Sequence, residues 1–194
     1  MSAVHHQPMT LMEFLDWEER QPTKYEFDGF QAVAMTGGTY AHARIQRNLS
    51  TAIDQRLAGK RCEFFGSDAK IEVAGRIRYP DGFVLCSAPP GDAKVARDPV
   101  VIFEVLSPGT ASTDYFIKNE EYAATPSVQR YVILAQDGMR GSVFERIGND
   151  WIGHILSAES VLQMPEIGIE VPLAEFYRGV EFPPARAEAE TTET

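Results

Sequence analysis

The run VVIFEVL, residues 100–106, constrains the fold of this 194-residue chain more than any other stretch. It is apolar except for Glu104, which is typical of a strand covered on both faces of a sheet. A carboxylate in such a strand is costly unless a cation pairs with it or a metal ion binds it. Two structural explanations stay open, namely a salt bridge to a neighbouring Arg or exposure of Glu104 at the strand end.

Helical and strand-like patterns alternate along the rest of the chain. Thr10 and Glu13 form a capping-box signal for a short helix, and Asp28-Gly29 predicts a β-hairpin turn. The clearest amphipathic helix runs from Tyr40 to Leu57 and ends before Gly59. Strand-like runs follow from Cys62 to Cys86. A second helix, capped by Ser112 or Thr113, is predicted to stop before Pro126.

This order predicts a mixed α/β (α+β) fold with one central sheet flanked by helices. We expect a flexible N-terminus over residues 1–9, one domain over residues 10–184 and a disordered acidic tail over residues 185–194. No apolar run approaches the roughly 20 residues that cross a bilayer, and we see no signal peptide. The sequence therefore predicts a cytoplasmic protein without membrane contact.

The charge and the cysteines limit the function. A net charge of −10 argues against a protein that coats nucleic acid by electrostatics alone. The segment between Tyr40 and Tyr79 nevertheless has a net charge of +4, so either a local basic face or ordinary solvated charges remain open. Cys62 and Cys86 are not in a Cys-x-x-Cys pair, and we interpret them as buried structural thiols.

A second acid stands close to an apolar strand. Asp81 lies in the turn Pro80-Asp81-Gly82 before the run GFVLC, 23 residues upstream of Glu104. If the two strands are neighbours, their carboxylates can converge, and such a pair favours a hard divalent cation such as Mg²⁺. Lys118 follows in the second helix, with Asp114 and Tyr122 spaced to share its face. The alternative for Lys118 is an exposed helical Asp–Lys pair.

These residues carry a resemblance. The motifs YPDG and IFEVLSPGT, followed by Asp114, Lys118 and Tyr122, resemble the Uma family of putative restriction endonucleases, in the PD-(D/E)XK nuclease-like superfamily. The resemblance extends over most of the chain. It implies a restriction-endonuclease-like core and a metal-dependent endonuclease that hydrolyses phosphodiester bonds of nucleic acid, with DNA the expected substrate. It also implies a homodimer.

In this interpretation Asp81 and Glu104 bind Mg²⁺ or Mn²⁺, with the carbonyl of Val105 as a further ligand. Lys118 positions the attacking water or stabilises the transition state. Glu26 matches the family's acid before the hairpin turn and assists the catalytic residues. His42 matches the family's histidine and is expected to touch the substrate or the acids; the alternative is an ordinary histidine on the helix surface.

Other polar residues have weaker signals. Asp28 and Asp68 have the character of turn residues, with a supporting role at the site open for Asp68. His5 and His6 are unconvincing ligands, and His154 is given no role.

Two departures from the family pattern keep alternatives open. The superfamily's usual lysine position, two residues after the acid, is Leu106, so the resemblance implies a migrated lysine at Lys118. Gly82 stands where the family more often has a β-branched residue. The first alternative is an inactive nuclease-fold protein that binds nucleic acid or another protein. The second is a dimeric scaffold whose acids pair with Arg76 or Arg78.

Overall fold

A six-stranded mixed sheet forms the centre of the protein. The computed structural model describes residues 4–5, 8–35, 37–107 and 111–182. In spatial order the central strands are β11 (Asp150–Leu156), β10 (Gly141–Ile147), β9 (Arg130–Ala135), β8 (Val101–Leu106), β7 (Gly82–Leu85) and β4 (Glu63–Gly66). Strands β8 and β9 are parallel and the other pairs are antiparallel. The predicted mixed central sheet is confirmed.

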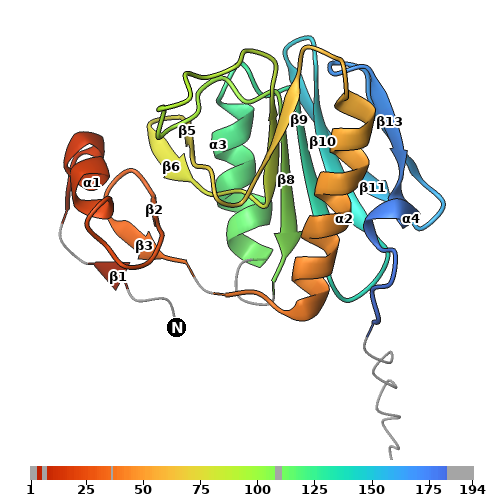
Figure 1. Cartoon of the computed structure of the whole chain (residues 1–194), viewed down its shortest axis with the longest axis horizontal. Helices are drawn as coiled ribbons and strands as arrows, with labels where there is room; N and C mark the ends of the chain where they lie inside the picture. The colour runs from red at the N-terminus through yellow and green to blue at the C-terminus, as the bar shows by residue number, and fades with distance from the viewer. Residues whose placement is uncertain (1–3, 6–7, 36, 108–110, 183–194) are drawn as a thin grey trace, which may run out of the picture.

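Helices cover both faces of this sheet (Figure 1). Helix α2 (Tyr40–Leu57) lies on one face, together with α4 (Leu173–Phe176) and the hairpin of β12 (Val161–Met164) and β13 (Ile169–Pro172). The other face carries the π-helical segment η1 (Thr113–Lys118) and its continuation α3 (Asn119–Ala123). Along β8, Val101, Phe103 and Val105 pack in the core on the α2 side, and Ile102 packs in the core on the α3 side. Because side chains alternate along a strand, Glu104 faces η1 and α3 with Ile102.

An N-terminal lobe stands beside the α3 side of the sheet (Figure 1). It consists of α1 (Leu11–Glu18) and a five-stranded sheet in the order β1 (Val4–His5), β3 (Ala32–Ala34), β2 (Tyr25–Phe27), β6 (Arg76–Arg78) and β5 (Ile71–Val73). The capping box between Thr10 and Glu13 is present, and Asp28 accepts the backbone bonds of the hairpin turn. The sequence did not separate this second sheet, because β5 and β6 lie between β4 and β7 in the chain.

Buried ion pairs hold the N-terminal lobe against the helix over the central sheet. Arg78 on β6 donates to both carboxylate oxygens of Glu121 on α3, at 2.7 and 2.6 Å. It also donates to Glu26 on β2 at 3.2 Å. The side chains of Arg78 and Glu121 are 3% and 4% exposed. Since breaking a buried pair leaves an uncompensated charge, these contacts fix the lobe in place.

The interpretation of the two cysteines as buried thiols was wrong, because Cys62 and Cys86 form a disulfide. Strands β4 and β7 pair antiparallel with Glu63 opposite Leu85. Continuing this register by one residue brings Cys62 opposite Cys86. The sequence separation of 24 residues carries no sign of this pairing, which depends on the hairpin register.

The structure explains the glycine at position 82. A Cβ atom there would lie 2.4 Å from Cζ of Phe64, whose ring occupies the space of a larger side chain at Gly82. Gly82 is opposite Gly66 in the β4–β7 ladder, where a Cβ would meet nothing within 4 Å. Phe64 thus fills the volume that a β-branched side chain at position 82 would take.

We expect Gly82→Val to lower the free energy of unfolding by about 1–3 kcal/mol, because it overpacks the site against Phe64. The double variant Gly82→Val/Phe64→Ala should lose less unfolding free energy than the two single variants together, because the smaller side chain at position 64 makes room for the larger one at position 82. Urea unfolding of the four proteins measures this coupling. Gly66→Val is the matched control and should cost less than Gly82→Val. Strict additivity would refute the packing explanation.

Candidate active site

Asp81 lies where the chain passes from the N-terminal lobe into the central sheet. Strand β6 ends at Arg78, and Tyr79 and Pro80 lead to Asp81 directly before β7. Strand β7 pairs antiparallel with β8, with Gly82 opposite Phe103. The condition for convergence of Asp81 and Glu104, that their strands are neighbours, is therefore met. The register sets Asp81 beside Glu104.

Three donors hold the carboxylate of Asp81. Gln46 Nε2 donates to Oδ1 at 2.6 Å, and His42 Nε2 lies 2.9 Å from the same oxygen. The backbone N–H of Val105 donates to Oδ2 at 2.6 Å. An ionised carboxylate can accept about four hydrogen bonds, so these contacts leave one lone pair, on Oδ2. His42 and Gln46 are one turn apart on α2 and contact Asp81 together.

Glu104 is 4% exposed and pairs with the helix above it. Its Oε1 accepts from Lys118 Nζ at 2.8 Å and from the hydroxyl of Tyr122 at 3.3 Å. Burial raises the pKa of Glu104 well above its ordinary value; Lys118 opposes the rise, and the carboxylates of Asp114, Asp81 and Glu26 add to it. Because Oε1 already takes two donors, Oε2 is the oxygen on which a cation would bind.

Lys118 is the cation at the centre of the acids. Its Nζ lies 2.8 Å from Glu104, 3.2 Å from Asp114 and 3.4 Å from Glu26. Although burial opposes its charge, Glu104 and the other surrounding carboxylates raise its pKa well above the ordinary value. The shared face of Asp114, Lys118 and Tyr122 is present even though η1 is π-helical rather than α-helical. Lys118 is 6% exposed, so it is not an exposed helical pair.

Glu26 joins the cluster from the N-terminal lobe. Its carboxylate accepts from the backbone N–H of Tyr79 at 3.0 Å and from Arg78 at 3.2 Å. Burial opposes its ionisation, but Lys118, Arg78 and the Tyr79 N–H together lower its pKa below the ordinary value. Glu26 therefore remains a carboxylate beside Lys118.

The predicted residues surround one cavity of about 600 Å³. Glu104 and Val105 lie on β8, Asp81 directly precedes β7, and Lys118 is the last residue of η1. His42 comes from α2 and Glu26 from the N-terminal lobe. The wall is completed by the lobe, the start of α2 and η1, including Lys24, Val33, Ala34, Gly38, Thr39, Gln46, Tyr79, Thr113 and Asp114. The sequence did not find Gln46; its only signal is its spacing one helical turn after His42.

Other candidates lie elsewhere. Asp68 is fully exposed and pairs with Lys24 at 2.5 Å. His154, on the edge strand β11, lies 3.0 Å from Glu145. His5 lies in β1, and His6 falls outside the described residues. The scaffold alternative needs Arg76 or Arg78 beside Asp81 and Glu104, but both contact Glu121, at 3.0 and 2.6 Å, and Arg78 also contacts Glu26 at 3.2 Å.

The oxygen donors at the cavity are of the chemical type that binds a hard divalent cation. Four carboxylates line the cavity, those of Glu26, Asp81, Glu104 and Asp114, and all but Asp81 lie within 3.4 Å of the ammonium group of Lys118. Oδ1 of Asp114 is buried and has no hydrogen-bond partner among the described residues, although it is within ion-pair distance of Lys118. Carboxylate oxygens in excess are the ligands that Mg²⁺ and Mn²⁺ prefer.

Within the described part of the chain, no three His, Cys, Asp or Glu side chains group closely enough to hold a metal ion unaided. Mg²⁺ needs only one or two carboxylates when waters and substrate phosphate complete its coordination. The N–H and C=O groups of one strand residue point the same way. The carbonyl of Val105 therefore faces the Asp81 side, where its N–H donates.

Comparison with known proteins gives consistent results. The model of the Uma2 family, described as "Putative restriction endonuclease", matches residues 11–174. Uncharacterized protein slr1290 of Synechocystis is 34% identical over 176 residues, which cover 88% of this chain and 92% of that protein. Uncharacterized protein sll1609 of the same organism is 27% identical over 150 residues, 74% of this chain and 85% of its own.

A solved structure shares the fold. The crystal structure of a putative nuclease belonging to DUF820 from Anabaena variabilis superposes with a TM-score of 0.72 at 16% identity. The match covers 88% of this chain and 98% of that one. The expected nuclease-like fold, with a mixed central sheet between helices, is confirmed by this likeness.

Proposed function

Because this chain belongs to the Uma2 family of putative restriction endonucleases, we propose that it is a metal-dependent endonuclease that hydrolyses phosphodiester bonds of DNA. The observation that carries the proposal is the convergence of Asp81 and Glu104, from neighbouring strands, on one cavity that also contains Lys118. The nuclease family supports hydrolysis of nucleic acid, and the donor set supports the metal.

Asp81, through Oδ2, and Glu104, through Oε2, would hold Mg²⁺ or Mn²⁺, with the carbonyl of Val105 as a further ligand. Such an ion, when bound, polarises the scissile phosphate and lowers the pKa of an attacking water. Gln46 and His42 orient the Asp81 carboxylate by donating to its other oxygen. His42 also lines the cavity, where it would contact the substrate.

Lys118 would stabilise the negative charge that develops on the phosphate and would orient the attacking water. Its ammonium group is buried and surrounded by carboxylates, which keep it protonated. Glu26, at 3.4 Å, fixes it from the lobe side. Leu106 cannot supply this charge, but Lys118 reaches Glu104 from the helix. This contact favours an active nuclease over an inactive nuclease-fold module.

We expect cleavage of DNA in Mg²⁺ or Mn²⁺ and none after EDTA removes the metal. End-labelled DNA incubated with the purified protein and resolved on a denaturing gel measures this. Heat-denatured protein controls for contaminating nuclease. DNA binding without cleavage in either metal would instead support the inactive binding module.

The proposal includes a homodimer and a cytoplasmic location. No helix in the described residues is long and apolar enough to cross a membrane. Disulfides are uncommon in a reducing cytosol, so the state of Cys62–Cys86 tests the location. Alkylation of free thiols in fresh lysate followed by mass spectrometry reports whether the bond exists in the cell. Light scattering after size-exclusion chromatography reports the oligomeric state.

A further inference from the structure

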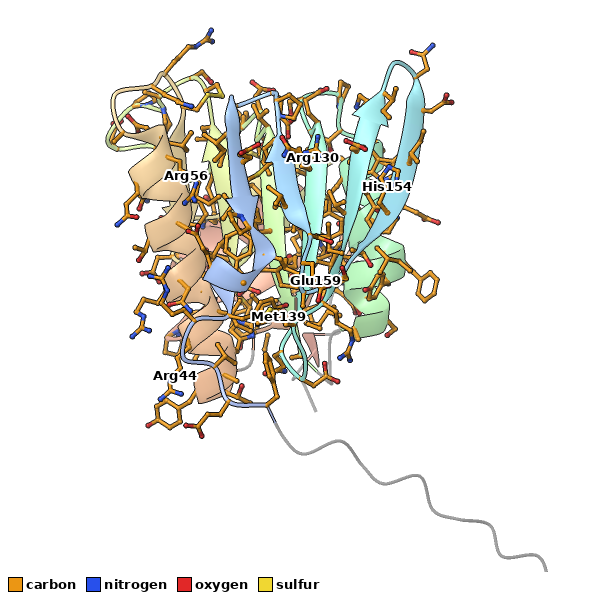
Figure 2. All side chains as sticks on the ribbon, turned by 90° about the vertical axis from the view of Figure 1, so that its right-hand side faces the viewer. Arg44, Arg56, Arg130, Met139, His154 and Glu159 are labelled. Carbon is orange, nitrogen blue, oxygen red and sulfur yellow. A yellow bond between two sulfur atoms is a disulfide. The ribbon has the colours of Figure 1, made fainter. Side chains whose placement is uncertain are left out.

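The basic residues between Tyr40 and Tyr79 are engaged in different parts of the fold. Arg44 donates to the carbonyl of Gly179 and Arg56 to Glu175; Figure 2 shows both on the side of α2 that faces the viewer with α4. Arg47 contacts Asn48, Lys60 the carbonyl of Gly168, Arg61 the carbonyl of Cys86, and Lys70 contacts Glu18. Arg76 and Arg78 both contact Glu121, and Arg78 also contacts Glu26. The lysines and arginines of this segment therefore do not line the cavity.

Among the described residues, the lysines and arginines that line the cavity are Lys24 and Lys118. Binding along a duplex draws its affinity from many Lys or Arg contacts to phosphates. A chain with a net charge of −10 and two cations at the cavity lacks such a footprint. The site therefore suits contact with few phosphates of one strand.

The candidate acids are also recessed. Glu104 and Lys118 are 4% and 6% exposed, and the side chain of Asp81 is 12% exposed. The lobe wall cannot move away freely, because Arg78 is bonded to Glu121 and Glu26, and Lys118 lies beside Glu26. A scissile phosphate must therefore enter the cavity to reach the acids.

We propose that the substrate of this site is a single-stranded segment of DNA rather than an intact duplex. Taking a nucleotide out of a duplex requires unstacking and unpairing, whereas an unpaired strand bears little of this cost. The cavity supplies two cations, Lys24 and Lys118, for the phosphates of such a strand. This inference rests on the proposed nuclease function, but one active site suffices for it, so it does not depend on a dimer.

Binding is the decisive measurement. Fluorescence anisotropy of a labelled oligonucleotide, free and annealed to its complement, is measured with Ca²⁺ in place of Mg²⁺. We expect at least tenfold tighter binding of the free strand. Equal affinity, preference for the duplex, or no binding of either form overturns the inference.

Two tryptophan variants localise the binding. Ala34→Trp places a large side chain in the lobe wall of the cavity, and we expect it to weaken single-strand binding at least tenfold. Ala58→Trp, exposed beyond the far end of α2 and outside the cavity, is the matched control and should bind like the native protein. Equal binding by a folded Ala34→Trp variant would overturn the cavity as the binding site. If that variant does not fold, the comparison of free and annealed strands still decides whether the protein prefers single-stranded DNA.

Cleavage separates this inference from the proposed function. The same free and annealed strands are incubated with Mg²⁺ and with Mn²⁺. At least tenfold faster cleavage of the free strand supports both ideas. Cleavage of the duplex at an equal or higher rate overturns the single-strand inference and leaves the nuclease function intact. Selective single-strand binding without cleavage supports the single-strand inference and overturns the proposed nuclease function.

Discussion

Asp81→Asn is expected to lower the rate of DNA cleavage at saturating Mg²⁺ by about a thousandfold. A bound metal ion contributes several kcal/mol to stabilising the transition state, and each 1.4 kcal/mol corresponds to about a tenfold change in rate. An amide has one oxygen and no negative charge. It therefore cannot both accept from the N–H of Val105 and supply an anionic ligand to the metal. Single-turnover cleavage in Mg²⁺ and in Mn²⁺ measures the loss.

Asp28→Asn is the matched control for this substitution. Asp28 lies in the hairpin turn and accepts from the N–H groups of Phe30 and Gln31, a role that an Asn side chain also fills. It should cleave at the native rate. Circular dichroism of both variants establishes that they are folded. A folded Asp81→Asn protein that cleaves within threefold of the native rate would falsify the assignment of Asp81.

Gln46→Ala tests the orientation of Asp81 separately. We expect a reduction of about tenfold in the rate constant for cleavage, with Gln46→Glu no better, because a carboxylate would repel Asp81 where the amide donates. Higher concentrations of Mn²⁺ should partly restore the Ala variant, since the remaining defect is in the geometry of a ligand. A purely structural role for Gln46 would lower the free energy of unfolding without this dependence on metal concentration.

Of the two candidate metal ligands, Glu104 was predictable from a local signal, whereas Asp81 alone has the character of a turn residue and was singled out by its place near Glu104 and by the resemblance to the family. Glu104 interrupts an otherwise apolar strand, and this alone indicated a buried charge that needs a partner. Helical spacing predicted that Lys118 shares a face with Asp114 and Tyr122, whereas its role beside the acids came from the resemblance to the family; it lies 2.8 Å from Glu104. The apolar run and the helical spacing are local signals, so one sequence carries them.

The remaining features depend on tertiary pairing. Gln46 reaches Asp81 because α2 packs over the strand pair that carries the acids. The disulfide depends on the register of β4 and β7, and the second sheet depends on β6 pairing with the distant β2. Phe64 fills the space at Gly82 from a neighbouring strand. None of these contacts follows from a residue's neighbours in the chain.

Lys118→Met is expected to lower the free energy of unfolding at neutral pH by about 3–5 kcal/mol, because it leaves buried carboxylates without their cation. Glu104, Asp114 and Glu26 all lie within 3.4 Å of Nζ, and the Lys118 side chain is 8% exposed. Urea unfolding in EDTA measures the change without bound metal. Lys94→Met, which removes an exposed partner of Glu19, is the matched control and should leave the free energy of unfolding close to that of the native protein.

The cost of Lys118→Met should shrink as the pH falls. Burial and the neighbouring carboxylates raise the pKa of Glu104 above its ordinary value of 4.5, and Lys118 is the group that opposes the rise. Without Lys118 the folded variant therefore takes up a proton on Glu104 at a higher pH than the unfolded chain does, and acid stabilises it relative to the native protein. A second substitution, Glu26→Gln, should recover part of the lost stability at neutral pH by removing one of the uncompensated charges. A stability difference that stays constant from neutral pH down to the ordinary Glu range would mean that Lys118 contributes packing alone, and its ammonium group would then have no part in holding the acids ready for the metal.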